Sequence, residues 1–211
     1  MVRVLCVARE AYPPISILPF DLQRALRRLK PQKRVQPLRR RPDSELSWAS
    51  DELPIGGALL LDTSVYLDVL QGRTPVAVDE LLIYRSCLHS AVALAELTHA
   101  FGRLDPAHPS TQSTLKAIQN TIDDIPKHRL YAPDLRIWGE AGILAGELFR
   151  VSGLPKGAGH ERRYLNDALI HLQAGVLGAS VLTGNIADFD FLNQLMPEIP
   201  IVLYRRQQPA P

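Results

Sequence analysis

The stretch GALLLDTSVYLDVL, residues 57–70, decides the fold because it holds the passage from a buried strand into a helix. The apolar residues 58–61 are typical of a short buried strand. Asp62, Thr63 and Ser64 follow at the tip of that strand. Two interpretations of Asp62 are open. Asp, Thr and Ser are favoured helix N-caps, whereas ligands of open α/β sheets bind outside the carboxyl ends of the strands.

Composition indicates an ordinary globular protein. The chain has 211 residues, of which 46% are hydrophobic and 22% charged, enough for one domain and an appendage. Its two cysteines, Cys6 and Cys87, form no disulfide or zinc pattern, so we expect a cytoplasmic protein. No apolar run approaches the length of a membrane span, and the apolar stretch near the N-terminus is too short for a signal peptide.

The charge is divided unevenly along the chain. Residues 1–56 hold 11 Lys or Arg against 6 Asp or Glu, and residues 57–211 hold 13 against 16. We therefore expect a basic, proline-containing N-terminal extension, residues 1–56, in front of a globular body, residues 57–205. Such basic runs are usually solvated or disordered. The possible RNA-binding residues of the extension are Arg27, Arg28, Lys30, Lys33, Arg34, Arg39, Arg40 and Arg41.

Two other roles for this extension stay open. It could dock on its own body or on a partner protein, with Leu22, Leu26 and Leu29 as the buried face of a short amphipathic helix. It could also be disordered, or lie before the true start of the protein. Prolines at five positions between 13 and 37 argue against one long helix in either case.

Short apolar runs alternate with helical patterns through the body. Strands are expected at 58–61, 88–94, 128–133, 180–185 and 199–204, and a loop at 154–164. The helical patterns between them cover 65–71, 75–87, 95–104, 108–126, 133–153, 165–179 and 187–195. This alternation predicts an α/β fold with a parallel sheet of four to five strands that is covered on both faces.

Four carboxylates stand where a predicted element begins or ends: Asp62, Glu96, Asp167 and Asp188. A lone acid at such a place is most often a helix cap, but four could converge at one edge of the sheet. Carboxylates packed together raise each other's pKa and need a cation. Mg²⁺ and Mn²⁺ prefer oxygen ligands. Such metals activate water for the hydrolysis of phosphodiesters.

Four motifs carry a family resemblance. LLLDTSVYLD (59–68), ALAELTHA (93–100), NDALIHLQA (166–174) and LTGNIADFDFL (182–192) resemble, in order and spacing, the motifs of PIN-domain ribonucleases, which include the VapC-like toxins of toxin–antitoxin pairs. The resemblance covers about residues 57–205. It implies a three-layer α/β/α fold, a Mg²⁺- or Mn²⁺-dependent endoribonuclease that cuts RNA, a homodimer and a possible cognate antitoxin. It also implies metal-binding, catalytic roles for Asp62, Glu96, Asp167 and Asp188.

Side chains beside these acids are candidates for support. We expect Thr63, Ser64, Thr183 and Asn185 to donate hydrogen bonds to the carboxylates or to bound water. The alternative is plain turn chemistry, because these residue types favour turns anyway.

Some positions depart from the family pattern. Gly184 stands where the family often has Arg, and His171 where a small residue is usual, so we expect a packed or rim histidine. Asp190 competes with Asp188 for the fourth acidic role, and Asp68 is expected to be solvated. The main rival function is a non-catalytic RNA-binding or protein-interaction module on the same fold. The choice between Mg²⁺ and Mn²⁺ and the identity of the RNA stay open.

Overall fold

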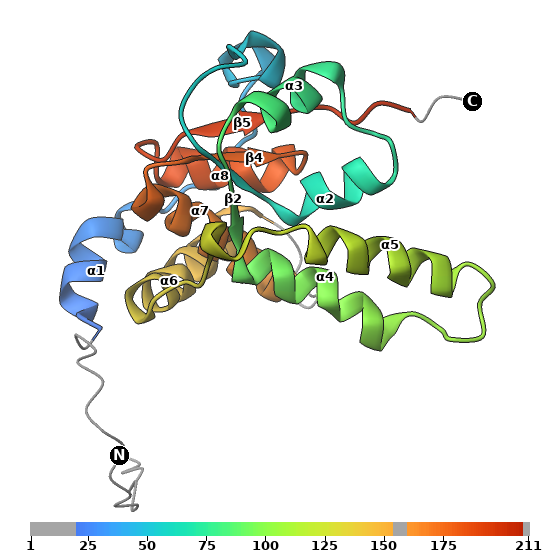
Figure 1. Cartoon of the computed structure of the whole chain (residues 1–211). Helices are drawn as coiled ribbons and strands as arrows, with labels where there is room; N and C mark the ends of the chain where they lie inside the picture. Colours follow the sequence, from blue (N-terminus) through green and yellow to red (C-terminus); the bar gives the residue numbers. More distant parts are fainter. Residues whose placement is uncertain (1–19, 154–159, 209–211) are drawn as a thin grey trace, which may run out of the picture.

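A computed structural model describes residues 20–153 and 160–208 (Figure 1). Five parallel strands form one sheet in the order β3-β2-β1-β4-β5, with β1 at its centre. The strands are β1 (Leu59–Leu61), β2 (Cys87–Ser90), β3 (Leu130–Tyr131), β4 (Ser180–Thr183) and β5 (Ile201–Leu203). The prediction of an α/β fold built on a parallel sheet of four to five strands is confirmed.

The helices follow the strands in the chain and cover the sheet on both sides (Figure 1). They are α1 (Leu22–Leu29), α2 (Thr63–Leu70), α3 (Val76–Tyr84), α4 (Ala91–Arg103), α5 (Thr111–Asp123), α6 (Leu135–Val151), α7 (His160–Leu177) and α8 (Ile186–Leu195). Short 3-10 turns lie at Pro31–Lys33, Asp43–Glu45, Ala49–Asp51 and Lys127–Arg129. The described elements therefore make three layers.

Alternation along the strands assigns side chains to two cores. Leu60 points into a core shared with α1, α6, α7 and α8, whereas Leu59 and Leu61 point into a second core shared with α2, α3, α4 and α5. Successive residues of a strand face opposite sides of the sheet, so a strand buried on both faces is apolar throughout. This is why residues 59–61 carry three leucines in a row.

The end of β2 and the start of α7 differ most from the sequence prediction. Strand β2 ends at Ser90, because the Ser90 hydroxyl accepts a hydrogen bond from the backbone N–H of Val92 (3.1 Å) and starts α4 at Ala91. The apolar residues 91–94 are therefore helical and not part of a strand. Helix α7 begins at His160, earlier than predicted. The rest of the expected loop, residues 154–159, lies outside the described residues.

The described part of the N-terminal extension is packed onto the body. Ala25 and Leu29 of α1 are buried, and α1 lies along α6. Leu46 also belongs to the core, and the backbone N–H of Leu203 in β5 donates to the carbonyl of Ser47 (2.9 Å). Leu22 is exposed, so the apolar face of α1 differs from the expected one. Residues 20–56 therefore contribute to the core and extend the β5 edge.

The order of the strands creates a switch point beside β1. From β1 the chain moves to β2 and β3 on one side, and then crosses over to β4 and β5 on the other. In open α/β sheets, ligands bind at such a point, outside the carboxyl ends of the strands. Asp62 and Thr183 lie at the carboxyl ends of β1 and β4. None of the described helices is both long and apolar enough to pass through a lipid bilayer.

His171 is a packed histidine in the middle of α7. It is fully buried, with its ring edge-on to Phe189 at 6.2 Å between centroids. Neither ring nitrogen has a hydrogen-bond partner at normal distance among the described residues. Burial lowers the pKa of His171 to about 4, an effect that the nearby backbone of Met196 only partly opposes. The imidazole is therefore neutral in the folded protein.

We expect His171 to make the fold sensitive to acid. The pKa of His171 is lower in the folded than in the unfolded state, so protonation favours unfolding. The stability that depends on a neutral imidazole is fully present above pH 6.5 and is lost as the pH falls toward 4. Between pH 7 and pH 5 this amounts to about 2 kcal/mol of unfolding free energy. Urea unfolding at both pH values should show a smaller loss for His171→Leu than for the wild type.

The exposed His128 provides the matched control. His128→Leu should lose as much stability between pH 7 and pH 5 as the wild type does. If His171→Leu behaves like His128→Leu, the buried neutral imidazole is not the cause.

Candidate active site

Asp62 is held at the end of β1 by three donors. Its Oδ2 accepts hydrogen bonds from the Ser64 hydroxyl (2.6 Å), the Thr183 hydroxyl (2.8 Å) and the Ser64 backbone N–H (3.3 Å). The last bond makes Asp62 the N-cap of α2. Asp62 therefore caps a helix and also stands at the carboxyl edge of the sheet. Its Oδ1 receives no donor from the described residues, so this oxygen is free to bind a ligand.

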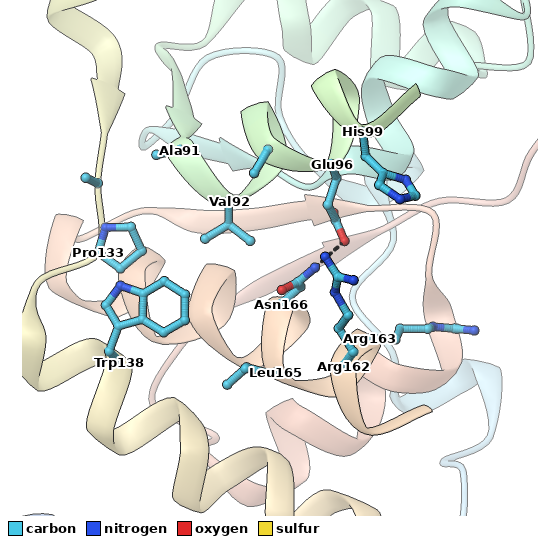
Figure 2. A pocket seen from close by; sticks show the side chains of 12 residues that line it. Ala91, Val92, Glu96, His99, Pro133, Trp138, Arg162, Arg163, Leu165 and Asn166 are labelled. Atoms are coloured by element: carbon cyan, nitrogen blue, oxygen red, sulfur yellow. Dashed lines mark hydrogen bonds between the residues drawn. The ribbon is translucent and has the colours of Figure 1, made fainter. Parts of the chain in front are cut away.

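Glu96 lies in the second turn of α4 and is fixed from two sides. Its Oε1 accepts a hydrogen bond from the Asn166 side-chain amide of α7 (2.6 Å; Figure 2), and its Oε2 accepts one from the Thr63 hydroxyl of α2. These bonds join three helices at one carboxylate. They hold Glu96 near the strand ends and leave little rotational freedom.

Asp167 of α7 and Asp188 of α8 are linked by one amide. The Asn185 Nδ2 donates to Asp167 Oδ2 (3.2 Å) and to Asp188 Oδ2 (3.0 Å). Arg163 forms an ion pair with Asp188 and donates to the Asn185 side-chain oxygen (3.2 Å). The neutral Asn185 amide therefore bridges Asp167 and Asp188, and the Arg163 guanidinium lies beside Asp188.

The four acids influence one another electrostatically. Burial raises the pKa of the Asp167 carboxyl well above its usual value, and the charges of Asp62, Asp188 and Glu96 raise it further, while Arg163 opposes them. Burial likewise raises the pKa of Asp62, with the Ser64 and Thr183 hydroxyls opposing it. Carboxylates shift each other's pKa in this way only when they lie close together in a poorly hydrated place. The four acids thus form one cluster, called here the acidic cluster.

The chemistry of the acidic cluster fits a hard divalent cation. Its donors are carboxylate oxygens alone, which are the ligands that Mg²⁺ and Mn²⁺ prefer, and a cation would relieve the repulsion around Asp167. The side chains of the described residues do not place three His, Cys, Asp or Glu groups around a single metal position. Asp188 is instead paired with Arg163, whose side chain is half exposed. An ion would compete with Arg163 for Asp188.

The residues expected to support the acids all contact them. Thr63 binds Glu96, Ser64 and Thr183 bind Asp62, and Asn185 binds Asp167 and Asp188, as described above. Sequence analysis missed Asn166 and Arg163. Asn166 directly precedes Asp167 in the chain, and this adjacency was the available signal. A hydrogen-bonding side chain next to one acid of the site can reach another, and Asn166 donates to Glu96.

The two other aspartates occupy different surroundings. Asp190 is fully buried, but it accepts hydrogen bonds from the Arg41 side chain (2.6 Å) and backbone N–H (2.9 Å) and does not join the acidic cluster. The expectation that Asp68 is solvated is wrong. Asp68 is buried, where it accepts hydrogen bonds from the Tyr204 hydroxyl (2.8 Å) and from Arg206 (2.9 Å).

This Asp68 network also explains Gly184. A Cβ at position 184 would lie 3.0 Å from Tyr204 Cζ and 3.1 Å from Asp68 Oδ2, closer than ordinary van der Waals contact. A Cβ there would require Tyr204 and Asp68 to shift by a few tenths of an ångström. Glycine is therefore the residue that this arrangement accommodates without rearrangement.

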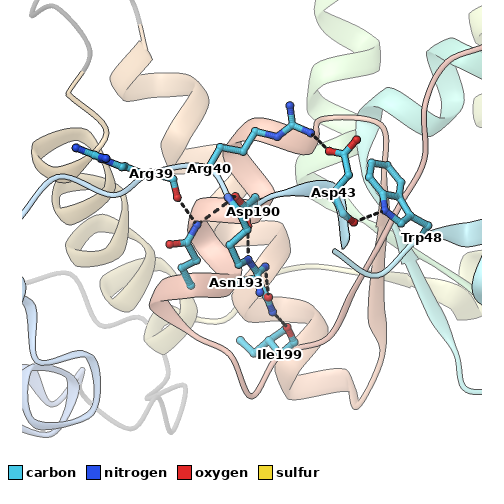
Figure 3. A network of polar contacts seen from close by, with 9 residues as sticks. Arg39, Arg40, Asp43, Trp48, Asp190, Asn193 and Ile199 are labelled. Atoms are coloured by element: carbon cyan, nitrogen blue, oxygen red, sulfur yellow. Dashed lines mark hydrogen bonds and ion pairs between the residues drawn. The ribbon is translucent and has the colours of Figure 1, made fainter. Parts of the chain in front are cut away.

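Three basic residues of the N-terminal extension are bound to buried acids of the body. Arg28 pairs with Glu140 (2.5 Å), Arg34 with Glu147 (3.2 Å) and Arg41 with Asp190 (2.6 Å). Figure 3 shows the polar network around Asp190. Of the roles left open for the extension, docking on the body is the one that the described residues 20–56 adopt, because the run supplies counter-ions to carboxylates that the core buries. The exposed members of the run that pair with no buried acid among the described residues are Arg27, Lys30, Lys33, Arg39 and Arg40.

Among known proteins, the chain resembles solved structures, and no match was found by sequence. No protein-family model and no curated protein matches the sequence. A chain of VapBC2 from Rickettsia felis, solved with a DNA fragment from their promoter, is 17% identical with a TM-score of 0.49, covering 70% of this chain and 98% of that chain. A chain of DNA-bound VapBC from Salmonella typhimurium is 22% identical with a TM-score of 0.47, covering 70% and 98%.

VapBC-5 from Mycobacterium tuberculosis, described as a member of the VapBC family of toxin–antitoxin systems, gives a similar result. It is 22% identical with a TM-score of 0.45, covering 71% of this chain and 99% of that chain. The chain is thus similar in structure to VapBC proteins. At these identities the likeness bears on the fold alone, and the function has to come from the residues at the site.

We expect the Arg41–Asp190 pair to be far more important for stability than its neighbour, the exposed Arg40–Asp43 pair. Arg41→Gln leaves a fully buried carboxylate without its counter-ion, which costs about 3–5 kcal/mol. Arg40→Gln removes a surface pair, which contributes at most about 1 kcal/mol. Urea unfolding of both variants at pH 7 measures the difference. Equal losses would contradict the docked arrangement of the extension.

Proposed function

We propose that the protein is a metal-dependent endoribonuclease that hydrolyses phosphodiester bonds of RNA. The observation that carries this proposal is the acidic cluster beside the switch point of the sheet. Asp62 follows β1 and Asp188 lies in the first turn of α8, while Glu96 in the second turn of α4 and Asp167 within α7 reach the same place. Each acid accepts a hydrogen bond from at least one neighbouring side chain, and Asp167 and Asp188 share the Asn185 amide. A group of buried acids that destabilises the fold is best explained by a positively charged cofactor and by chemistry on a charged substrate.

The acidic cluster would hold Mg²⁺ or Mn²⁺ through Asp62, Glu96, Asp167 and Asp188. When bound, such an ion supplies an activated water and offsets the charge of the phosphate. The polar neighbours of the cluster position the ligands. Ser64 and Thr183 donate only to Oδ2 of Asp62, which leaves Oδ1 for a ligand, and Asn185 bridges Asp167 and Asp188.

Arg163 is suited to respond to substrate. It pairs with Asp188, yet half of its side chain is exposed. Once a cation neutralises Asp188, the guanidinium is available for a phosphate oxygen, which it can bind through two parallel N–H groups. The exposed cations of the N-terminal extension, among them Arg27, Lys30 and Lys33, are further candidates for contacts with the RNA backbone.

The biological role that we propose is that of the toxin in a toxin–antitoxin pair, acting as a homodimer in the cytoplasm and controlled by a cognate antitoxin. This part rests on the resemblance of the four sequence motifs to VapC-like toxins. Induced expression in a bacterial host should then arrest growth, and Asp62→Asn should relieve the arrest at an equal protein level. Arrest by both forms would favour the non-catalytic binding module.

Cleavage should require both the metal and the acids. Purified protein should cut a single-stranded RNA in Mg²⁺ or Mn²⁺, and chelation should abolish cutting. Asp62→Asn and Asp167→Asn should each lower the rate by about a hundredfold or more, because each removes a charged ligand. Gel analysis of end-labelled RNA measures the rates.

Asp123, an exposed residue of α5, gives the matched control for these substitutions. Asp123→Asn should cut at the wild-type rate. Cutting that persists in chelator, or in Asp62→Asn, would overturn the proposed mechanism and point to a contaminating nuclease or to metal-free chemistry.

The neighbours of the acids should affect metal affinity. Ser64→Ala and Asn185→Ala each remove a hydrogen bond to a proposed ligand, so each should weaken Mn²⁺ binding about tenfold or more. Isothermal titration measures this, with the exposed Ser113→Ala of α5 as the control. If both variants bind Mn²⁺ as tightly as the wild type does, these residues only stabilise the turns in which they lie and do not support metal binding.

A further inference from the structure

A pocket of about 700 Å³ adjoins the acidic cluster. It lies between α4, the connection from β3 to α6, the first turn of α6 and the first turns of α7. Figure 2 shows its two ends, with Trp138 and Pro133 at one and Glu96, Asn166 and Arg162 at the other. The pocket is thus apolar and flat-sided at one end and polar at the other.

Trp138 is a large aromatic residue on the exposed face of α6. Ile137, Ala141 and Leu144 form the inner face of α6 and are covered, whereas Trp138 keeps 47% of its surface in contact with solvent. A half-exposed indole on a concave surface offers a large stacking area that the fold itself does not use. Val92 and Leu165 line the pocket beside it and extend this apolar area.

The polar end of the pocket is shared with the acidic cluster. Glu96 lines the pocket and is also a member of the cluster, so a molecule in the pocket lies next to the proposed site of cleavage. Arg162 at the same end forms no ion pair within the described residues and is exposed. It therefore provides a free cation between the aromatic end and the acids.

A flat aromatic wall at one end of the pocket and a cation without an ion pair among the described residues at the other match a nucleotide, in which a planar base is joined to a phosphate. The open pocket continues toward the cluster, which favours a base within a strand. In an RNA duplex the bases are stacked on each other and are not available to side chains, whereas unpaired bases stack on aromatic residues.

We propose that this pocket takes one unpaired nucleobase of a single-stranded RNA, stacked on Trp138, while Arg162 contacts the adjoining phosphate. The inference rests on the proposed ribonuclease function and names its substrate class. Recognition of one splayed base makes the enzyme selective for loops and single strands and places the adjacent phosphodiester at the acidic cluster.

The chain offers a direct spectroscopic test, because it has only two tryptophans. In Trp48→Phe, Trp138 is the sole tryptophan, and Trp48 lies outside the lining of this pocket. Binding is measured in chelator, so that the RNA stays intact. A single-stranded oligoribonucleotide should quench the emission of Trp138, whereas a duplex or an abasic strand of equal length should not. Equal quenching by the abasic strand, or none by any RNA, would overturn the proposal.

Affinity provides an independent measurement. Trp138→Ala should weaken binding of the single strand about five- to hundredfold, the range expected for loss of one base–aromatic stack, and Trp138→Phe should restore most of it. Phe101→Ala is the matched control, since Phe101 is equally exposed on α4 but outside the pocket lining. Identical affinities for Trp138→Ala and Phe101→Ala would contradict the stacking role.

The two proposals fail in different ways. If the wild type cuts no RNA but Trp138 still distinguishes the base-bearing strand from the abasic one, the nuclease proposal fails and the base pocket stands. If the wild type cuts RNA and neither the emission nor the affinity depends on Trp138, the base pocket fails and the nuclease proposal stands.

Discussion

Parallel pairing of β1 with both β2 and β4 is the constraint on which the rest of the structure depends. Leu59, Leu60 and Leu61 pair in register with Cys87, Leu88 and His89 on one side and with Ser180, Val181 and Leu182 on the other. Because all the strands run the same way, their carboxyl ends meet at one edge. Asp62 and the β4–α8 turn come together there, and α4 and α7 add Glu96 and Asp167. One pairing pattern therefore assembles a site from segments more than a hundred residues apart.

The acidic cluster shows how a fold tolerates charges that oppose it. Buried like charges destabilise the folded state, and the rise in the pKa of Asp167 expresses that cost. Hydroxyl and amide donors from Thr63, Ser64 and Asn185 offset part of it. The donors orient the carboxylates without neutralising them, which leaves the charge available for a cation. Arg163 is the one full positive charge that the described residues place against the cluster.

A second set of charges fastens the N-terminal extension. Glu140, Glu147 and Asp190 are buried in the body, and each would be strongly unfavourable alone. The extension brings Arg28, Arg34 and Arg41 to them across sequence separations of 112, 113 and 149 residues. The basic composition of this segment therefore serves the fold first. Only its exposed cations are left for other contacts, and the base pocket beside Trp138 lies on a different part of the surface.

The sequence by itself determined the α/β alternation, the parallel sheet and the places of Asp62 after β1 and of Asp188 in the first turn of α8, because these follow from local periodicity and capping chemistry. The expectation that Asp167 opens its helix is wrong, because α7 begins at His160 and Asp167 lies within it. Ser90 shows the limit of prediction from local patterns. Its hydroxyl caps α4, so the apolar residues 91–94, which were expected in a strand, are helical. Only the tertiary structure decided which charges are buried together. Asp68 looked solvated, and the role of the basic run stayed open, because their partners, Tyr204 and the acids of α6 and α8, are distant in the chain. Burial and pairing depend on the packing of whole elements, and no local pattern encodes that packing.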